Sequence, residues 1–345
     1  MTSPSDLNLF LRQLPKAELH LHLEGMLSPQ RVLSLAKKYS VALDSDELAS
    51  RYNLRGFTQF LELYKWATSF LREPDDYVQL AQDAADALHE QGVVYAEITL
   101  SVGVMLLRKQ NVAANFRALK EIFDRNAAAH SGPQVQYIFD AVRQFGPAPA
   151  MEVARVAAEL KHQGVVAFGL GGDELSIPLS NFRPIYKFAA EHGLHLLAHA
   201  GETGGPEQIQ DAIDVLHAER IGHGIAAIRS SSLMNTLANR KIPLEICPTS
   251  NLRTNALSIQ LNSAHSKIAH HPLPKLFRHG IPVTISTDDP AMFNTTLLGE
   301  YSAVLQMGLS LNDLLAINRT AFEHSFLPEP ARQSFLSQLP SSAAD

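Results

Sequence analysis

Histidine and acidic side chains recur in this chain at spacings that suit a metal site. His20 and His22 lie two residues apart, so on a β-strand both imidazoles would point to the same side. His199 is a third imidazole, and the carboxylate of Glu202 follows it closely. A lone histidine is usually a satisfied core residue, but these combinations favour a metal.

Two further groups extend this set. His223 lies between two glycines at the end of a short β-rich run. Asp288 and Asp289 follow an apolar run, and adjacent strand residues point to opposite sides. One of these carboxylates can therefore bind a metal while the other has a different role. Each group alone could be a turn or a cap, but the four together indicate one site.

Three imidazoles and one carboxylate form a ligand set that suits zinc and leaves a position open for water. Zinc lowers the pKa of its bound water from ~15.7 to ~7, so hydroxide becomes available at neutral pH. Glu202 and His223 then remain as groups that can move protons and orient the hydroxide. This arrangement predicts hydrolytic attack on an electrophilic carbon.

The elements that must position these residues alternate between short β-rich runs and longer helical patterns. Several runs are apolar without alternation, as expected for strands covered on both faces. Eight strands with intervening helices predict a protein of the α/β class with a single (β/α)₈ TIM-type barrel. The expected strands are residues 17–23, 93–101, 135–143, 165–171, 194–199, 220–223, 243–247 and 282–287, and the helical patterns are residues 28–39, 75–91, 148–163 and 182–192.

All four groups fall at the carboxyl ends of expected strands, the face on which barrel enzymes carry out their chemistry. An open doubly wound sheet is the alternative fold. It usually has a glycine-rich phosphate loop after its first strand, where this chain has His-Leu-Glu-Gly at 22–25. We therefore expect one barrel domain over residues 1–345, with a frayed tail at 340–345.

One long segment, residues 45–71, exceeds what a minimal barrel needs. Its aromatic and leucine side chains recur at helical spacing, which fits an ordinary amphipathic helix. The alternative is an inserted lid helix region over the carboxyl-terminal mouth of the barrel, with Phe60 and Tyr64 contacting substrate. The side chains concerned are Phe57, Phe60, Leu61, Tyr64 and Phe70.

The bulk composition restricts the possible partners. A net charge of −6 over 345 residues gives no electrostatic footprint for nucleic acid or an anionic membrane. No apolar run approaches the ~20 residues of a membrane helix, and the N-terminus does not resemble a signal peptide. The single cysteine, Cys247, excludes a cysteine-based metal site and is expected to be a small buried residue. We expect a cytoplasmic protein that acts on a small molecule.

Taken together, four sequence motifs resemble those of the adenosine deaminase family, a group of metal-dependent hydrolases. They follow the family's order and spacing and cover nearly the whole chain, so the combination is specific although each motif alone is weak. The resemblance implies zinc-dependent hydrolytic removal of the 6-amino group from an adenine-type ring, with release of ammonia. The motifs are PKAELHLHLEG at 15–25, HAGET at 199–203, RIGHG at 220–224 and STDDP at 286–290, and CPTSN at 247–251 is also similar.

The resemblance also implies a role for individual residues. One Zn²⁺ per chain would be held by four ligands, and the purine ring would be read at N1, N3 and N7. By this resemblance His20, His22, His199 and Asp288 are the zinc ligands, Glu202 protonates N1, His223 orients the zinc-bound hydroxide, Asp289 contacts N7, and the backbone of Gly172 donates to N3.

Position 24 bears on the sugar side of the substrate. Adenosine deaminases usually carry Asp there, where it meets the ribose 5′-hydroxyl, and Glu24 instead resembles the adenine deaminase branch. The Gly-Asp-Glu sequence at 172–174 resembles the nucleoside branch. We expect a nucleoside substrate, either adenosine or aminodeoxyfutalosine, an adenosine-like menaquinone precursor. Free adenine is the alternative.

Three other interpretations can be weighed against this one. A two-metal amidohydrolase commonly needs a bridging lysine on the fourth strand, and residues 165–171 contain none. Cysteine-ligated deaminases that act on flipped bases need a Cys-x-x-Cys pair, and this chain has only one cysteine. A non-catalytic purine-binding protein would have lost a ligand or Glu202, and all are present. The remaining histidines are expected to be structural or solvated, His270 and His271 in a solvated turn before Pro272.

Overall fold

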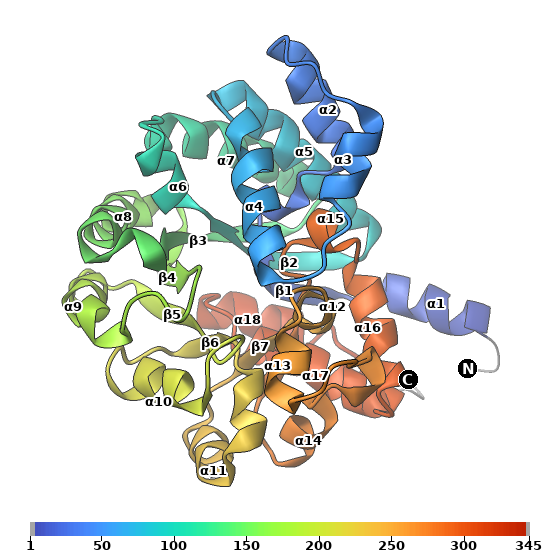
Figure 1. The fold of residues 1–345 in the computed structure, drawn as a ribbon. Coiled ribbons are helices and arrows are strands. Elements are labelled where there is room, and N and C mark those ends of the chain that lie inside the picture. Colours follow the sequence, from blue (N-terminus) through green and yellow to red (C-terminus); the bar gives the residue numbers. More distant parts are fainter. Residues whose placement is uncertain (1–3, 343–345) are drawn as a thin grey trace.

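The computed structural model describes residues 4–342 as an eight-stranded barrel surrounded by helices (Figure 1). All strands are parallel, and each pairs with the next one along the chain. This confirms the predicted (β/α)₈ barrel and all eight expected strands to within two residues at each end. The strands are β1 (Lys16–His22), β2 (Val93–Leu100), β3 (Gln134–Val142), β4 (Val165–Gly171), β5 (His195–Ala200), β6 (Arg220–His223), β7 (Leu244–Ile246) and β8 (Val283–Ile285).

The four helical patterns expected from the sequence are present as α2 (Pro29–Lys38), α5 (Pro74–Glu90), α8 (Pro147–Leu160) and α9 (Arg183–Glu191). Helix α2 has a hydrogen-bonded N-cap, since the Ser28 side chain accepts the backbone N–H of Arg31 at 3.1 Å. The other α-helices are α1 (Pro4–Gln13), α3 (Ser45–Arg51), α4 (Phe57–Ala67), α6 (Val102–Leu107), α7 (Val112–Ala128), α10 (Pro206–Asp214), α11 (Ser231–Arg240), α12 (Pro248–Arg253), α13 (Ala256–Leu261), α14 (Leu273–Arg278), α15 (Pro290–Phe293), α16 (Leu297–Gln306), α17 (Leu311–Glu323) and α18 (Glu329–Leu336).

The barrel closes between its first and last strands at the position of three expected ligands. Leu21 of β1 and Asp288, just beyond β8, form a parallel bridge. The His22 N–H donates to the Asp288 carbonyl at 2.8 Å, and the Asp288 N–H donates to the His20 carbonyl at 3.1 Å. Asp288 adopts a left-handed φ of 67°, which is uncommon for a residue with a side chain and is typical of functional sites. Closure of the barrel therefore assembles part of the metal cluster.

A buried charged chain crosses the barrel interior. The guanidinium of Arg220 on β6 pairs with Glu97 of β2 and with Glu245 of β7, the latter at 2.6 Å. Arg220 is only 1% exposed, and a buried charge is tolerated only when it is paired. This chain ties three strands together and places the Glu245 carboxylate next to the metal cluster.

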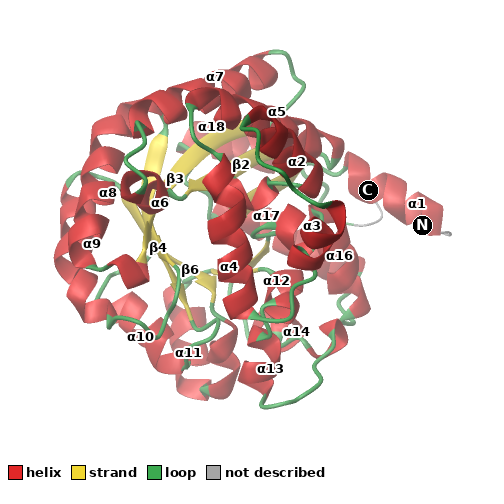
Figure 2. Ribbon diagram, turned by 45° about the horizontal axis from the view of Figure 1, so that its top comes forward, coloured by secondary structure: helices red, strands yellow, loops and turns green. Residues whose placement is uncertain are grey.

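The long segment at residues 45–71 forms α3, α4 and one turn of 3₁₀-helix, Thr68–Phe70. Figure 2 shows α4 crossing the open end of the barrel. The guanidinium of Arg108 anchors the end of α4, since it donates to the carbonyl of Lys65 at 2.9 Å and to that of Thr68. Phe70, the last side chain of the expected stripe, is buried, and its ring centroid lies 5.3 Å from that of Trp66.

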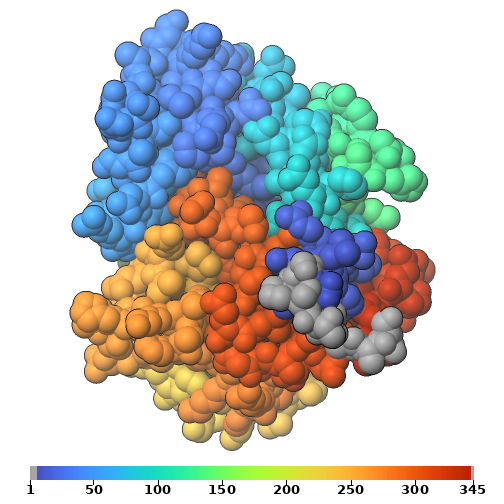
Figure 3. Space-filling view, turned by 90° about the vertical axis from the view of Figure 1, so that its right-hand side faces the viewer, coloured from blue at the N-terminus to red at the C-terminus, as the bar shows by residue number. Residues whose placement is uncertain are grey.

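The first and last described segments lie on one face of the molecule (Figure 3). Of the tail expected to fray at 340–345, residues 343–345 lie outside the described part, and residues 340–342 form neither helix nor strand. Within residues 4–342, no helix is both long enough and apolar enough to span a membrane.

Candidate active site

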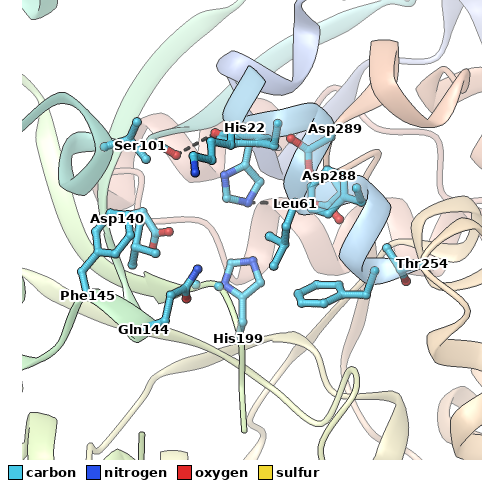
Figure 4. Close-up of a pocket in the computed structure, with 18 of the residues that line it drawn as sticks. His22, Leu61, Ser101, Asp140, Gln144, Phe145, His199, Thr254, Asp288 and Asp289 are labelled. Carbon is cyan, nitrogen blue, oxygen red and sulfur yellow. Dashed lines mark hydrogen bonds and ion pairs between the residues drawn. The ribbon is translucent and has the colours of Figure 1, made fainter. Parts of the chain in front are cut away.

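A cavity of about 350 Å³ opens at the carboxyl ends of the strands, next to α4 (Figure 4). Figure 4 shows the rings of His22 and His199 facing the same space from different strands. Residues near strand ends contribute a polar wall, and α4, α6 and neighbouring loops contribute apolar side chains. The polar wall includes His22, Asp140, His199, Glu202, His223, Asp288 and Asp289, and the apolar residues include Phe57, Phe60, Leu61, Val104 and Phe145.

The four expected metal ligands come together in one cluster. His20, His22, His199 and Asp288 each offer one atom, and these atoms lie within 4.8 Å of one another. Oδ1 of Asp288 is 3.4 Å from Nε2 of His20 and 3.5 Å from Nε2 of His22. Three strand ends, those of β1, β5 and β8, thus converge on one point.

The atoms of this cluster are arranged as a divalent metal requires. Nδ1 of His20 lies 2.7 Å from Oε2 of Glu245, which keeps a proton on Nδ1 and leaves Nε2 as the ring atom that can bind a metal. That Nε2 is buried and has no hydrogen-bond partner among the described residues. The hydroxyl of Ser250 donates to Oδ2 of Asp288 at 2.6 Å, which leaves Oδ1 facing the two histidines. Unpartnered donor atoms that converge in this way fit a bound cation.

The charges of the cluster support the same conclusion. Burial lowers the pKa of His22 and of His199 to about 3, so both rings are neutral. Burial also opposes the charged form of His20, but its interactions with the Asp288 and Glu245 carboxylates outweigh burial and raise its pKa to about 10. The cluster therefore holds one positive charge on His20, which a metal ion would replace on binding.

Glu202 faces the cavity from the loop after β5. Burial, together with the negative charges of Asp288 and Glu174, raises its pKa to about 8, so the carboxyl group holds a proton at neutral pH. The hydroxyl of Thr254 donates to its Oε1 at 2.9 Å. Glu174 fixes the loop, because its carboxylate accepts the backbone N–H groups of Glu202 and Gly204, each at 2.9 Å. Glu202 is thus a buried acid on a firmly held loop.

Asp289 also lines the cavity. Its Oδ1 is buried and lacks a hydrogen-bond partner within residues 4–342. Burial and the adjacent charge of Asp288 raise its pKa well above the usual range, so it can act as an O–H donor. Gly25 makes room for it, since a Cβ there would lie 2.2 Å from the same oxygen. Gly172 also lines the cavity, with a φ of 96° that favours glycine.

His223 lies between the cluster and Glu202. Its Nε2 is 3.6 Å from Oε2 of Glu202 and 3.8 Å from Oδ2 of Asp288. Burial lowers its pKa to about 3, so the ring is neutral. Like Asp288, it has a left-handed backbone, with φ of 62°.

Glu24 does not line the cavity, although two residues bonded to it do. Its carboxylate accepts the backbone N–H of Ser101 at 3.2 and 3.3 Å, and the Tyr64 hydroxyl lies 3.4 Å from its Oε2. The Tyr64 and Ser101 hydroxyls are 2.7 Å apart, and both residues line the cavity. Burial raises the pKa of Glu24 to about 7.

Sequence reasoning missed several residues of the site. Glu245 is a charged residue inside an apolar strand, a signal that could have been noticed. Asp140 of β3 lines the cavity in space left by two glycines of β4, and burial raises its pKa to about 8. The expected solvated turn at His271 is wrong: the residue is only 4% exposed, and its ring accepts the Leu273 N–H and bonds to Asn251. Cys247 is buried, as expected.

Comparison with known proteins identifies the family. A sequence profile of adenosine deaminases matches residues 15–342. The chain belongs to the adenosine deaminase family. Aminodeoxyfutalosine deaminase of Streptomyces coelicolor is 36% identical over 335 residues, which cover 95% of this chain and 84% of that protein. Adenine deaminase of Chelativorans sp. is 35% identical over 325 residues, covering 94% and 97%.

A solved structure of an adenine deaminase has the same fold. The crystal structure of adenine deaminase from Arthrobacter aurescens matches with a TM-score of 0.86 and 28% identity, covering 94% of this chain and 97% of that one. The protein is therefore a hydrolytic deaminase of amidine-containing purines, and the non-catalytic alternative does not hold. Family membership and the three-histidine, one-aspartate cluster together indicate a divalent metal.

Proposed function

We propose that the protein catalyses zinc-dependent hydrolytic deamination of the 6-amino group of an adenine-type nucleoside, with release of ammonia. The observation that carries this proposal is the convergence of four nitrogen and oxygen ligand atoms beside a cavity that a buried acid, Glu202, also faces. Three imidazoles and a carboxylate, without a thiolate, suit zinc. The ligands would be His20, His22, His199 and Asp288, holding one ion per chain.

Glu202 supplies the acid of this mechanism. A zinc ion held by the four ligands would lower the pKa of a water beside Glu202 to about 7. Because the pKa of Glu202 is raised to about 8, it holds a proton at neutral pH and delivers it to ring N1. Protonation at N1 makes C6 more electrophilic, which is the change that hydrolytic attack requires. His223 faces the same region through Nε2 and orients the attacking water.

Two further groups recognise the purine ring. Asp289 is a neutral acid with an unpartnered oxygen, so its O–H can donate to N7. The backbone of Gly172, which lines the cavity, donates to N3. Together with Glu202 these groups read three ring nitrogens of a 6-aminopurine. A cytosine ring offers no N7 and should be rejected.

The position of Glu24 supports a nucleoside over the free base. A glutamate that filled the sugar space would favour adenine, but this carboxylate bonds to Ser101 and Tyr64 outside the cavity. A cavity of about 350 Å³ leaves room beyond a purine ring for a sugar. Adenosine and aminodeoxyfutalosine are the leading substrates. The second candidate is free adenine, which adenine deaminase relatives at 35% identity favour.

Helix α4 completes the proposal as a lid. Phe57, Leu61 and Tyr64 line the cavity from a helix that crosses the mouth of the barrel. Such a cover keeps bulk water away from the reacting groups. Phe60 also lines the cavity, but its ring packs 4.9 Å from that of Phe293 and is 9% exposed, so it supports the fold as well.

A substrate panel tests the function directly. Adenine, adenosine, deoxyadenosine, adenosine monophosphate and aminodeoxyfutalosine would be compared by kcat/KM for ammonia release. We expect a nucleoside to exceed free adenine by at least about tenfold, equivalent to ~1.4 kcal/mol of transition-state preference. A tenfold advantage of adenine would overturn the nucleoside assignment, and no release from any of the five would overturn the proposal.

A further inference from the structure

A chain of buried hydrogen bonds reaches His223 from the side opposite the cavity. The Leu273 N–H donates to Nδ1 of His271 at 3.1 Å. Nε2 of His271 lies 3.2 Å from Oδ1 of Asn251, and Nδ2 of Asn251 lies 3.1 Å from Nδ1 of His223. His271, Asn251 and His223 are 4%, 0% and 1% exposed, so solvent does not compete for these bonds.

The backbone amide at one end sets the direction of every bond in this chain. An N–H can only donate, so Nδ1 of His271 is an acceptor and carries no proton. Burial lowers the pKa of His271 to about 3, so the neutral ring carries its one proton on Nε2.

The protonated nitrogen of His271 in turn fixes the orientation of the Asn251 amide. The proton on Nε2 of His271 is donated to Oδ1 of Asn251, which turns the NH₂ group of Asn251 towards His223. Nδ1 of His223 must accept from that NH₂ group. The proton of the His223 ring is therefore on Nε2.

We propose that Asn251 and His271 are positioning residues that hold His223 in its Nε2–H tautomer. Nε2 is the atom on the reaction side, 3.6 Å from Oε2 of Glu202. With a proton there, His223 donates a hydrogen bond to the attacking water and does not take a proton from it. The catalytic consequence rests on the proposed function, whereas the tautomer follows from the hydrogen-bond chain alone.

A neutron structure of the zinc-loaded enzyme, crystallised from D₂O, tests the tautomer without reference to any substrate. We expect deuterium on Nε2 and none on Nδ1 of both His223 and His271. Deuterium on Nδ1 of His223 would overturn the proposal. Because this measurement involves no turnover, its failure is distinct from a failure of the proposed reaction.

The variant Asn251→Asp tests the catalytic consequence. A carboxylate of the same shape accepts from both neighbours, so His223 would carry its proton on Nδ1 and lose the donor that faces the reaction. Loss of a hydrogen-bond donor or a wrong histidine tautomer typically costs ~10²–10⁴-fold in rate. We expect kcat to fall by about 10²-fold or more, with KM and zinc content close to normal.

The chain offers a matched control at its surface. Asn235 makes a similar bond to an exposed histidine, with its Oδ1 2.8 Å from Nε2 of His279. Asn235→Asp should leave kcat, KM and zinc content unchanged. Asn251→Asp with an unaltered kcat would contradict the positioning role, and the neutron structure decides the tautomer if that variant does not fold.

Discussion

The two walls of the cavity are built in different ways. On the strand wall, the polar side of the cavity, two of the four expected ligands have a buried hydrogen-bond partner behind them: His20 has Glu245 and Asp288 has Ser250. On the helix wall, α4 presents half-buried apolar side chains such as Leu61 and is anchored by Arg108 near one end. One wall is fixed by buried hydrogen bonds and charge pairs, and the other by apolar packing.

This difference suggests a division of labour in which one wall supports the reaction and the other selects the substrate. Strand ends in a closed barrel cannot shift independently, so groups placed there keep the geometry that proton transfer and metal binding need. An inserted helix can change without disturbing the barrel. We infer that the strand wall fixes the reaction, whereas the helix wall determines what is attached to the purine.

Removal of an expected metal ligand from the strand wall should have the largest effect on activity. In His199→Ala the cluster loses one of its four ligands, and we expect zinc and ammonia-releasing activity to disappear together. Elemental analysis and turnover would be measured on the same sample. His162→Ala, at an exposed surface position, is the control. A variant that keeps full activity would remove His199 from the ligand set.

Glu202→Gln should distinguish the loss of the proposed acid from the loss of the metal. Glutamine keeps the size and hydrogen bonding of the side chain but cannot deliver the proton, so we expect kcat to fall ~10²–10⁴-fold while zinc content stays near normal. If the protonated form of Glu202 is the active one, as proposed, kcat/KM of the parent enzyme should decline as the pH rises through the pKa of about 8. The variant should lack that decline. Loss of zinc would place Glu202 among the ligands.

Glu245→Gln probes the partner behind a ligand. Because Glu245 orients His20 and holds its proton on Nδ1, we expect zinc affinity to weaken ~10–100-fold, measured by competition with a chelator. Glu219→Gln is the matched control, since Glu219 bonds to Nδ1 of the exposed His195 at 2.9 Å. Equal zinc affinities of the two variants would mean that Glu245 does not tune the metal site.

The smallest effect is expected on the helix wall. Leu61→Ala removes apolar contact with the substrate, so KM should rise roughly 3- to 10-fold with little change in melting temperature. Phe70→Ala, on the same segment but away from the cavity, should instead cost about 3–5 kcal/mol of unfolding free energy and leave KM unchanged. If Leu61→Ala lowers stability and spares KM, α4 is an ordinary core helix and no lid.

The sequence predicted the barrel and the residues of the strand wall because both leave local signals. Alternation of β-rich and helical runs gives the fold, and paired histidines at strand ends, such as His20 and His22, give the cluster. The partners behind them depend on which strands become neighbours in space. Glu245 meets His20 across 225 positions of sequence, and no local pattern predicts that contact.

The sequence also did not predict in which direction two of the side chains point. His271 looks like part of a polar turn because it follows another histidine and precedes a proline, yet it is buried and hydrogen-bonded to Asn251. Glu24 lies in a motif of the site, yet its carboxylate turns to the backbone of Ser101. In both cases a distant partner decides where the side chain points, and the residue type alone does not reveal that partner.

Stoichiometric reconstitution tests the central claim most directly. The enzyme would be stripped of metal, titrated with Zn²⁺, and assayed for ammonia release from adenosine at each step. We predict negligible activity at zero equivalents, a linear rise and a plateau at about one zinc per chain. Full activity without metal, or a plateau that requires two ions, would contradict a one-zinc deaminase built on the cluster of His20, His22, His199 and Asp288.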